Sequence, residues 1–487
     1  MTRRKSVSAL LLLTLLFTAC GETVQQTPID SEPVANSDDS TTVDDALLSD
    51  NLPDDLDFNG RELRILSSQE YEGFGDGLHM LLVTENSGDI LDDAIYQRNL
   101  KVMERFGVTF VETPMTYNEA HTLVRTSVSA GDDVYDVISL ADRNALSLVA
   151  DGMIYYMDEL PYIDLEREYW NQTLNESITI ADRQVLAYSD MMLTAYDFTH
   201  LLSFNKAMID ELSLDDPYTL VDSGKWTLDR FNEYLAAATS DLNGDTIYDE
   251  NDRYGFVSDA KQVSPCFWIA AGCLSIEKDD SDIPRFVMNS ERMLNTLDRV
   301  YQLTWENDYW YKKLGVEEIG YTMFSNGQAL FCNASFDALF GGIFRASNVE
   351  YGVIPYPKYD ESQERYYTRV EGGFPYVVPV TVNDTEFVGA MLEALACESH
   401  NTVLPAYYEV ALKTKYTRDD TSARILDMIM EGRIYDFGDT FLTGNVRDGF
   451  VAQTFSAGQP MTASKIESNT ATVEAAIGDI VEAVTGE

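Results

Sequence analysis

The chain has 487 residues, of which 45% are hydrophobic and 11% aromatic, enough apolar side chains to fill the cores of two or three domains. Its 82 Asp and Glu outweigh 34 Lys and Arg, which gives a formal net charge of −48. So acidic a body repels phosphate backbones and anionic lipid surfaces, which argues strongly against nucleic acid as a partner and against general membrane-surface binding. Five Cys and four His leave little room for a disulfide-dense scaffold or a histidine-rich metal site.

The first twenty residues are typical of a bacterial export signal. Basic residues at 3–5 precede an apolar run at 10–17 that is too short to span a bilayer. The tetrapeptide Phe-Thr-Ala-Cys that ends at Cys20 resembles the lipobox of bacterial lipoproteins, although the lipobox usually has Leu in place of Phe17. The resemblance implies a signal peptide over 1–19 and acylation of Cys20 by fatty acids such as palmitate, which would anchor the protein to the extracytoplasmic face of the cell membrane. The alternative is an ordinary secretory signal with a chance cysteine.

Residues 20–58 differ sharply in composition from the rest of the chain. They are rich in Asp and Glu, include Pro28, Pro33 and Pro53, and contain no Lys or Arg. Because like charges repel and few apolar side chains are available for burial, we expect an extended, flexible tether.

The remaining body is predicted to be mixed α/β. Apolar side chains at helical spacing predict helices over 92–106 and 144–150. Short β-rich runs predict strands at 62–67, 108–111, 134–140, 185–188, 201–204, 328–332 and 351–354. Alternation of the two kinds of element favours parallel-rich sheets with helices on both faces.

Several motifs of this body resemble family 1 extracellular solute-binding proteins, the substrate-capturing lipoproteins of ABC importers. In the predicted N-terminal lobe the similar segments are ENSGD at 85–89, DAIYQRN at 93–99 and ERFGV at 104–108. Further along they are LSFNK at 202–206, KWTLDRF at 225–231, FSNGQAL at 324–330 and YGVIPYPK at 351–358. No single motif is specific, but their order and spacing extend the resemblance over residues 60–480.

The resemblance implies a type II periplasmic-binding-protein-like fold, in which two α/β lobes close around a solute like a Venus flytrap. The motifs place lobe 1 at 59–198 plus 330–372 and lobe 2 at 199–329 plus 373–487. The crossings between lobes are expected near 196–198, 328–332 and 372–378. Gly372 and Gly373 suit either a hinge or a plain turn.

The function that the resemblance implies is capture of a carbohydrate, an oligosaccharide in our interpretation, and its delivery by a monomeric protein to the permease subunits of an ABC transporter. The sequence has no HExxH, GxSxG, Walker or CxxC motif. Its many carboxylates leave a glycosidase open as an alternative. A surface adhesion lipoprotein is the third class considered.

A candidate calcium loop runs from Asp241 to Asp252. Oxygen-bearing side chains at positions 1, 3, 5, 9 and 12, with a backbone carbonyl at position 7, match the EF-hand pattern. The predicted ligands are Asp241, Asn243, Asp245, Ile247, Asp249 and Asp252. The loop has Thr246 where the pattern has Gly, and Asp252 where it has Glu, and the alternative is a solvated acidic turn.

Aromatic and acidic side chains near the expected crossings are candidates for binding a sugar, because rings stack on sugar faces and carboxylates accept hydrogen bonds from hydroxyl groups. The candidates are Tyr196, Phe267, Trp268, Phe336, Phe374, Tyr376, Asp142, Asp197, Asp337 and Glu371. For each of them packing in the core or exposure on the surface is the alternative. Cys266 and Cys273 are spaced for a small disulfide loop, unless one continuous helix holds them about 10 Å apart.

Overall fold

The structure is a computed structural model that describes residues 47–70, 81–312, 317–340, 344, 347, 349–408, 420–442 and 445–486. The predicted signal peptide, Cys20 and the first part of the predicted tether lie outside these residues. Residues 47–487 form one compact unit. Within the described part of the chain, no helix combines the length and apolar character needed to cross a bilayer.

The first of two main sheets is built from strands of the N-terminal half and one later strand. Its order is β2 (Val108–Thr116), β1 (Arg61–Glu70), β3 (Val137–Ser139), β12 (Tyr376–Pro379), β4 (Ile154–Tyr155). The strands β1, β2 and β3 run parallel, and β12 is antiparallel to its neighbours. Leu63, Ile65 and Leu66 of β1, which lies between β2 and β3, are fully buried, as expected for a strand covered on both faces.

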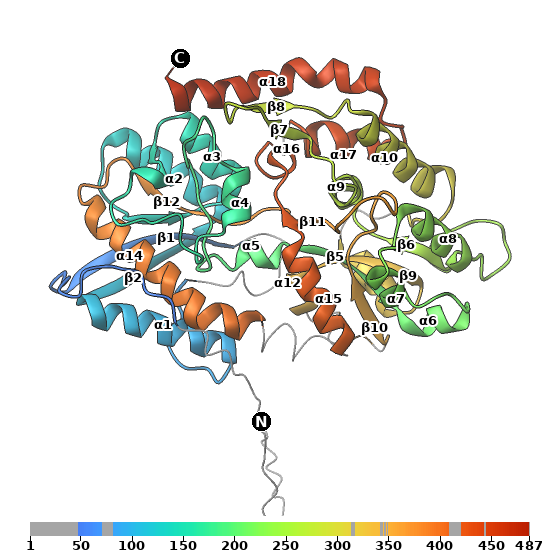
Figure 1. Cartoon of the computed structure of the whole chain (residues 1–487), viewed down its shortest axis with the longest axis horizontal. Coiled ribbons are helices and arrows are strands. Elements are labelled where there is room, and N and C mark those ends of the chain that lie inside the picture. Colours follow the sequence, from blue (N-terminus) through green and yellow to red (C-terminus); the bar gives the residue numbers. More distant parts are fainter. Residues whose placement is uncertain are drawn as a thin grey trace, which may run out of the picture. The chain divides into compact units, whose positions relative to one another are not determined.

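Helices cover this sheet and share its hydrophobic core. They are α1 (Ile90–Phe106), α2 (Tyr117–Ala130), α3 (Asp142–Ala150), α4 (Gln172–Ser177), α14 (Thr385–Glu398) and α18 (Ala463–Thr485). The predicted helix over 92–106 is confirmed, because Asp89 caps the start of α1 and Gly107 ends it at φ 60°. Figure 1 shows α18 along one edge of the molecule, where it packs against α3 and against β8 (Pro284–Phe286), which pairs with β7 (Ile276–Lys278).

The second sheet has the order β10 (Tyr351–Ile354), β5 (His200–Asn205), β9 (Ala329–Ser335), β6 (Tyr254–Val257). Every residue of β9 is buried. Around the sheet lie α6 (Lys206–Glu211), α7 (Pro217–Asp222), α8 (Leu228–Ala238), α9 (Ala260–Ala270), α10 (Glu291–Tyr301), α11 (Glu317–Ser325), α12 (Phe336–Phe340), α15 (Asp420–Glu431) and α17 (Ala452–Ser456). Its core is strongly aromatic, with Trp226, Phe231 and Phe331 within 6.0 Å of one another between ring centres.

The strand pairing corrects the predicted division into lobes. The sequence places 330–372 in lobe 1 and 373–487 in lobe 2, whereas β9 and β10 both pair with β5 in the second sheet. The strand β12 instead pairs with β3 in the first sheet, and α14 packs there too. Segment 328–332 is therefore not a crossing, because residues 329–332 belong to β9, which pairs with β5 and β6 within the second sheet.

The predicted tether is wrong for its last residues. Leu52 is only 6% exposed, and the Asp50 carboxylate lies 2.5 Å from the Arg105 guanidinium of α1. The backbone N–H of Leu48 also donates to Asn401 at 2.9 Å. The apolar side chains at 47–58 pack on the folded body, so that body includes residues 47–58.

The predicted strand at 185–188 is buried, but it is not a strand.

Candidate functional site

Three segments that connect the two cores lie side by side. The first contains α5 (Thr194–Asp197) and leads into β5. The second contains β11 (Thr368–Arg369) and leads into β12, and the third contains β13 (Arg433–Ile434). Thr199 and Val370 form an antiparallel bridge, and β11 pairs in parallel with β13. The crossings predicted near 196–198 and 372–378 thus fall at this junction, and the third lies near β13.

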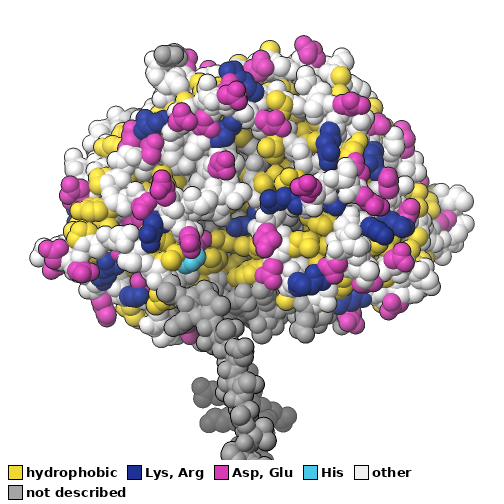
Figure 2. Space-filling view, viewed as in Figure 1, with side chains coloured by type: hydrophobic (Ala, Val, Ile, Leu, Met, Phe, Trp, Pro, Cys, Tyr) yellow, Lys and Arg dark blue, Asp and Glu magenta, His cyan; other side chains and the backbone are white. Residues whose placement is uncertain are grey.

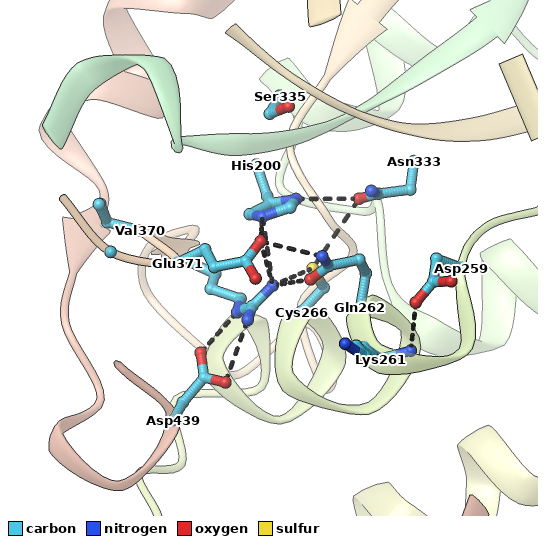
Figure 3. A network of polar contacts seen from close by, with 12 residues as sticks. His200, Asp259, Lys261, Gln262, Cys266, Asn333, Ser335, Val370, Glu371 and Asp439 are labelled. Carbon is cyan, nitrogen blue, oxygen red and sulfur yellow. Dashed lines mark hydrogen bonds and ion pairs between the residues drawn. The ribbon is translucent and has the colours of Figure 1, made fainter. Parts of the chain in front are cut away.

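A carboxylate at the junction, Glu371, is held by donors from several elements (Figure 3). It accepts hydrogen bonds from His200 Nε2 of β5 at 3.0 Å and from Gln262 Nε2 of α9 at 2.9 Å. Arg447 Nη1 donates to its other oxygen at 2.8 Å. The Glu371 side chain still keeps 26% of its surface exposed. A clamped carboxylate with a solvent-facing side is a preorganised acceptor for a ligand hydroxyl group.

Beneath Glu371 a fully buried ion pair extends the network. Arg369 grips Asp439 of α16 (Phe437–Thr440) through Nε at 2.6 Å and Nη2 at 3.0 Å. Neither side chain has exposed surface, and Arg369 Nη1 lies 3.6 Å from Glu371. Two-point pairing of this kind fixes the orientation of both partners.

The charges of the network follow from its geometry. Burial alone would lower the pKa of His200, but Cys266 and the hydrogen bond to Glu371 raise it to about 10. Each ring nitrogen has an acceptor, Glu371 for Nε2 and Asn333 Oδ1 for Nδ1 at 3.2 Å, and these favour an imidazolium, whereas the Arg369 guanidinium, 3.2 Å from Nε2, opposes it. Burial opposes ionisation of Glu371, yet Arg369 and Arg447 hold its pKa well below the usual range. Glu371 is therefore anionic at any physiological pH.

Asp142 lies at the same junction but is buried. It begins α3, accepts a hydrogen bond from the backbone N–H of Gly373, and leaves its Oδ1 without a partner. Burial raises the pKa of Asp142 well above its usual range. A Cβ on Gly372 would lie 2.5 Å from this carboxylate, and one on Gly373 would lie 2.8 Å from the Tyr188 ring. The two glycines are thus required by close packing, whether or not they also act as a hinge.

Most of the predicted aromatic site residues are core residues. Trp268 is 0% exposed and donates from Nε1 to Asp436 at 2.7 Å, so in this structure it offers no stacking face. The others with little exposed surface are Phe267, Phe336, Phe374 and Tyr376. Phe374 nevertheless packs 6.4 Å from half-buried Phe198, whose carbonyl accepts the Glu371 N–H. An aromatic pair therefore lies beside the backbone of Glu371, and one of its two rings, Phe374, is a predicted site residue whereas Phe198 is not.

Three further predicted residues surround the first crossing segment. Tyr196 is buried and donates its hydroxyl proton to Asp190. Asp197 accepts a hydrogen bond from the Tyr407 hydroxyl at 2.8 Å, and half-buried Asp337 accepts one from Ser335. The sequence missed the cationic members of the junction, which are His200, Arg369, Arg433 and Arg447. Buried basic residues are rare in so acidic a chain, but no local motif marks these four.

One face of the molecule is mixed in character. Figure 2 shows acidic and basic side chains scattered over the face drawn, with hydrophobic side chains gathered near its centre.

The four described cysteines are buried and free, Cys266 and Cys273 among them. Cys273 lies just beyond the end of α9, which holds Cys266.

The candidate calcium loop is closed by its own hydrogen bonds. Asp241 accepts the N–H groups of Gly244 at 2.7 Å and Thr246 at 2.8 Å. Asp252 is 0% exposed, and its two oxygens accept the N–H groups of Leu242 and Asp249, both at 2.9 Å. Across the described residues no three His, Cys, Asp or Glu side chains are grouped to hold a metal ion. The loop in this conformation therefore does not fit a preformed cage, and calcium binding stays a prediction.

Comparisons with known proteins identify the fold. No protein-family model and no curated protein matches the chain. Solved structures do match, among them the ABC substrate-binding protein Lmo0181 from Listeria monocytogenes in complex with cycloalternan, at 9% identity, 86% coverage of this chain, 99% of that chain and a TM-score of 0.54. The maltose/maltodextrin-binding domain MalE from Bdellovibrio bacteriovorus, bound to maltotriose, is 15% identical, and the match covers 86% of this chain and 100% of that chain with a TM-score of 0.55. UgpB from Mycobacterium tuberculosis, in complex with glycerophosphocholine, is 17% identical, and the match covers 80% of this chain and 95% of that chain with a TM-score of 0.52.

At these identities the likeness shows the fold alone. The predicted fold class is confirmed: the chain is α/β and type II periplasmic-binding-protein-like.

The burial of Trp268 predicts a stability defect. Replacing it by alanine should lower the free energy of unfolding by about 3–5 kcal/mol, because a large core side chain is lost. Trp268→Phe retains most of the apolar volume but removes the hydrogen bond to Asp436, so it should cost less. Chemical denaturation of the ligand-free protein measures both values. A Trp268→Ala protein as stable as the wild type would contradict the core assignment.

His200 predicts a pH-dependent contribution to stability. Because its folded pKa is raised to about 10, its stabilising effect is complete below the unfolded value of about 6.5 and is lost as the pH rises through 10. The difference in melting temperature between wild type and His200→Gln should shrink from pH 6 to pH 10. His121 is the control, because burial lowers its pKa, so the stabilisation that it gives is lost toward low pH instead. A His200 difference that grows with pH would contradict the assigned charge.

Proposed function

We propose that this chain is a family 1 extracellular solute-binding protein that captures a carbohydrate, specifically an oligosaccharide, and delivers it to the permease subunits of an ABC transporter. The fold supports the proposal, and two of the similar structures contain oligosaccharides. The observation that carries it is the partly exposed Glu371, clamped at the junction beside Phe198. A fixed acceptor next to an aromatic edge suits the hydroxyl groups and apolar faces of a sugar.

The same junction favours binding over catalysis. A glycosidase needs one carboxylic acid with a raised pKa and one carboxylate, and Asp142 and Glu371 have pKa values shifted in those opposite directions. However, Asp142 is buried and tied to the N–H of Gly373. Glu371 accepts three hydrogen bonds, so its nucleophilicity is reduced. We therefore propose a monomeric binding protein that returns the sugar unchanged.

A saccharide panel tests this function. Binding only to the folded state should raise the melting temperature, since ligand at 100 times Kd adds about 2.7 kcal/mol. Glu371→Gln should weaken the affinity about tenfold or more, because a charged acceptor is lost. The control is Asp222→Asn, since Asp222 pairs with Arg424 on the surface and should leave affinity unchanged. Mass spectrometry of the recovered sugar separates the classes: hydrolysed product would favour the glycosidase, and no binding to any saccharide would contradict the proposal.

We also propose that Cys20 anchors the protein to the extracytoplasmic face of the cell membrane. The support is the lipobox-like sequence after the apolar run, because two acyl chains are enough for stable anchoring. Cys20→Ala should release the protein from membranes or leave the signal peptide uncleaved. Membrane fractionation and the mass of the mature chain check this, and an unchanged distribution with normal processing would contradict it.

Calcium is proposed as a structural ligand of the Asp241–Asp252 loop. The oxygen-rich spacing supports the proposal, and the affinity should lie near the 10⁻⁴–10⁻³ M of extracellular modules. Calcium should raise the melting temperature, EDTA should reverse the rise, and Asp245→Ala should abolish it. If the internal hydrogen bonds alone hold the loop, the melting temperature will respond to neither calcium nor EDTA.

A further inference from the structure

One buried cation at the junction, Arg433, is not among the side chains that hydrogen-bond to Glu371. Arg433, the first residue of β13, is 7% exposed. Its guanidinium lies over the Tyr196 ring, 4.2 Å from the centroid, and Nη1 donates to the carbonyl of Ala195 at 3.2 Å. It thus joins the third connecting segment to α5 of the first.

Arg433 lacks the partner that a buried cation normally has. Among the described residues no carboxylate lies within 4.0 Å of its guanidinium, and its Nε is buried without a hydrogen-bond partner. Buried Arg369, in contrast, has the Asp439 carboxylate. Buried Arg98 also lacks a carboxylate, but Leu81, Asn99 and Ser399 supply neutral acceptors. A charge buried without a counter-ion lowers the stability of the folded state, so the position of Arg433 is not explained by stability.

The neighbouring carboxylates are already engaged. Asp190 accepts hydrogen bonds from Tyr196 and from His400, the latter at 2.6 Å. Asp197 holds the Tyr407 hydroxyl, and Asp142 holds the N–H of Gly373. None of them is placed to neutralise Arg433 directly.

The remaining edge of the guanidinium has a specific shape. Nη1 donates to the carbonyl of Ala195, Nε is buried without a hydrogen-bond partner, and the nearby Tyr196 hydroxyl also interacts with the guanidinium. Nε and Nη2 form the side of the guanidinium whose two parallel N–H groups match the two oxygens of a carboxylate. We propose that this edge receives an oxyanion on the bound solute, and that the solute is an acidic oligosaccharide whose uronate carboxylate pairs with Arg433.

This inference rests on the proposed function and narrows its substrate class. A net charge of −48 repels anions at long range, so an acidic solute needs a local cation to offset that repulsion. A buried guanidinium, whose field is weakly screened, supplies it. A neutral sugar would leave the same charge unpaired in the complex.

The test measures affinity by calorimetry with trimers of galacturonate, mannuronate and glucuronate. Each is compared with its methyl ester, which is uncharged, and with neutral maltotriose. Glycerophosphocholine provides the phosphodiester arm. The variants are Arg433→Gln, which keeps a donor for Ala195 but no charge, and Arg433→Lys, which keeps the charge but not the two-point edge. Arg98→Gln is the matched buried-arginine control.

At least one free uronate should bind at least tenfold more tightly than its ester. Arg433→Gln should remove that preference, and Arg433→Lys should restore only part of it. Without ligand, Arg433→Gln should melt no lower than the wild type, because an unpaired buried charge is removed, whereas Arg98→Gln should melt lower. Preference for glycerophosphocholine, lost in Arg433→Gln, would retain the oxyanion site but overturn the uronate assignment.

Other outcomes separate the two proposals. Equal binding of uronate and ester, or a preference unchanged in Arg433→Gln, overturns the inference and leaves a saccharide-binding protein. A ligand-free Arg433→Gln protein as destabilised as Arg98→Gln overturns the unpaired-charge argument. Failure of every saccharide to bind overturns the proposed function itself.

Discussion

The buried pair between Arg369 and Asp439 is the interaction on which the junction depends. Arg369 comes from the segment that links the second sheet to the first, and Asp439 follows the third connecting segment. Removing one partner of a buried ion pair typically costs 3–5 kcal/mol, because the other charge is left unpaired. The orientation of Glu371 is set by the same arginine together with Arg447 and His200. The partly exposed Glu371 carboxylate is therefore held in place by the same contacts that fix the buried ion pair.

Close packing imposes a second constraint at the same place. Side chains at Gly372 and Gly373 would collide with Asp142 and Tyr188, which belong to the first core. The connecting segments are also hydrogen-bonded to each other across Thr199 and Val370. A relative motion of the two cores that separates these segments must therefore break the packing at the two glycines and the bridge between Thr199 and Val370.

The sequence predicted local elements better than long-range pairing. The helix at 92–106 and the strands at 201–204 and 351–354 follow from periodicity and capping, which are local. The assignment of β9 to a lobe depends on its partners β5 and β6, which are distant in sequence, and it was wrong. For Trp268 a local signal existed: the last five residues of α9, CFWIA at 266–270, are all apolar, and a helix segment that is apolar all round belongs to a core. Isolated cations such as Arg433 carry no such pattern.

The burial of Trp268 has a practical consequence for following ligand binding. Four of the five tryptophans, Trp170, Trp226, Trp268 and Trp310, have almost no exposed surface. Indole emission depends on contact with water, so these four fluorophores will respond strongly when the chain unfolds and weakly when a solute occupies the junction. Tyrosines crowd the junction instead, and Tyr196 and Tyr435 lie beside Arg433 and Gly372. An optical reporter of occupancy in this protein would have to be introduced near Phe198 as an extrinsic dye.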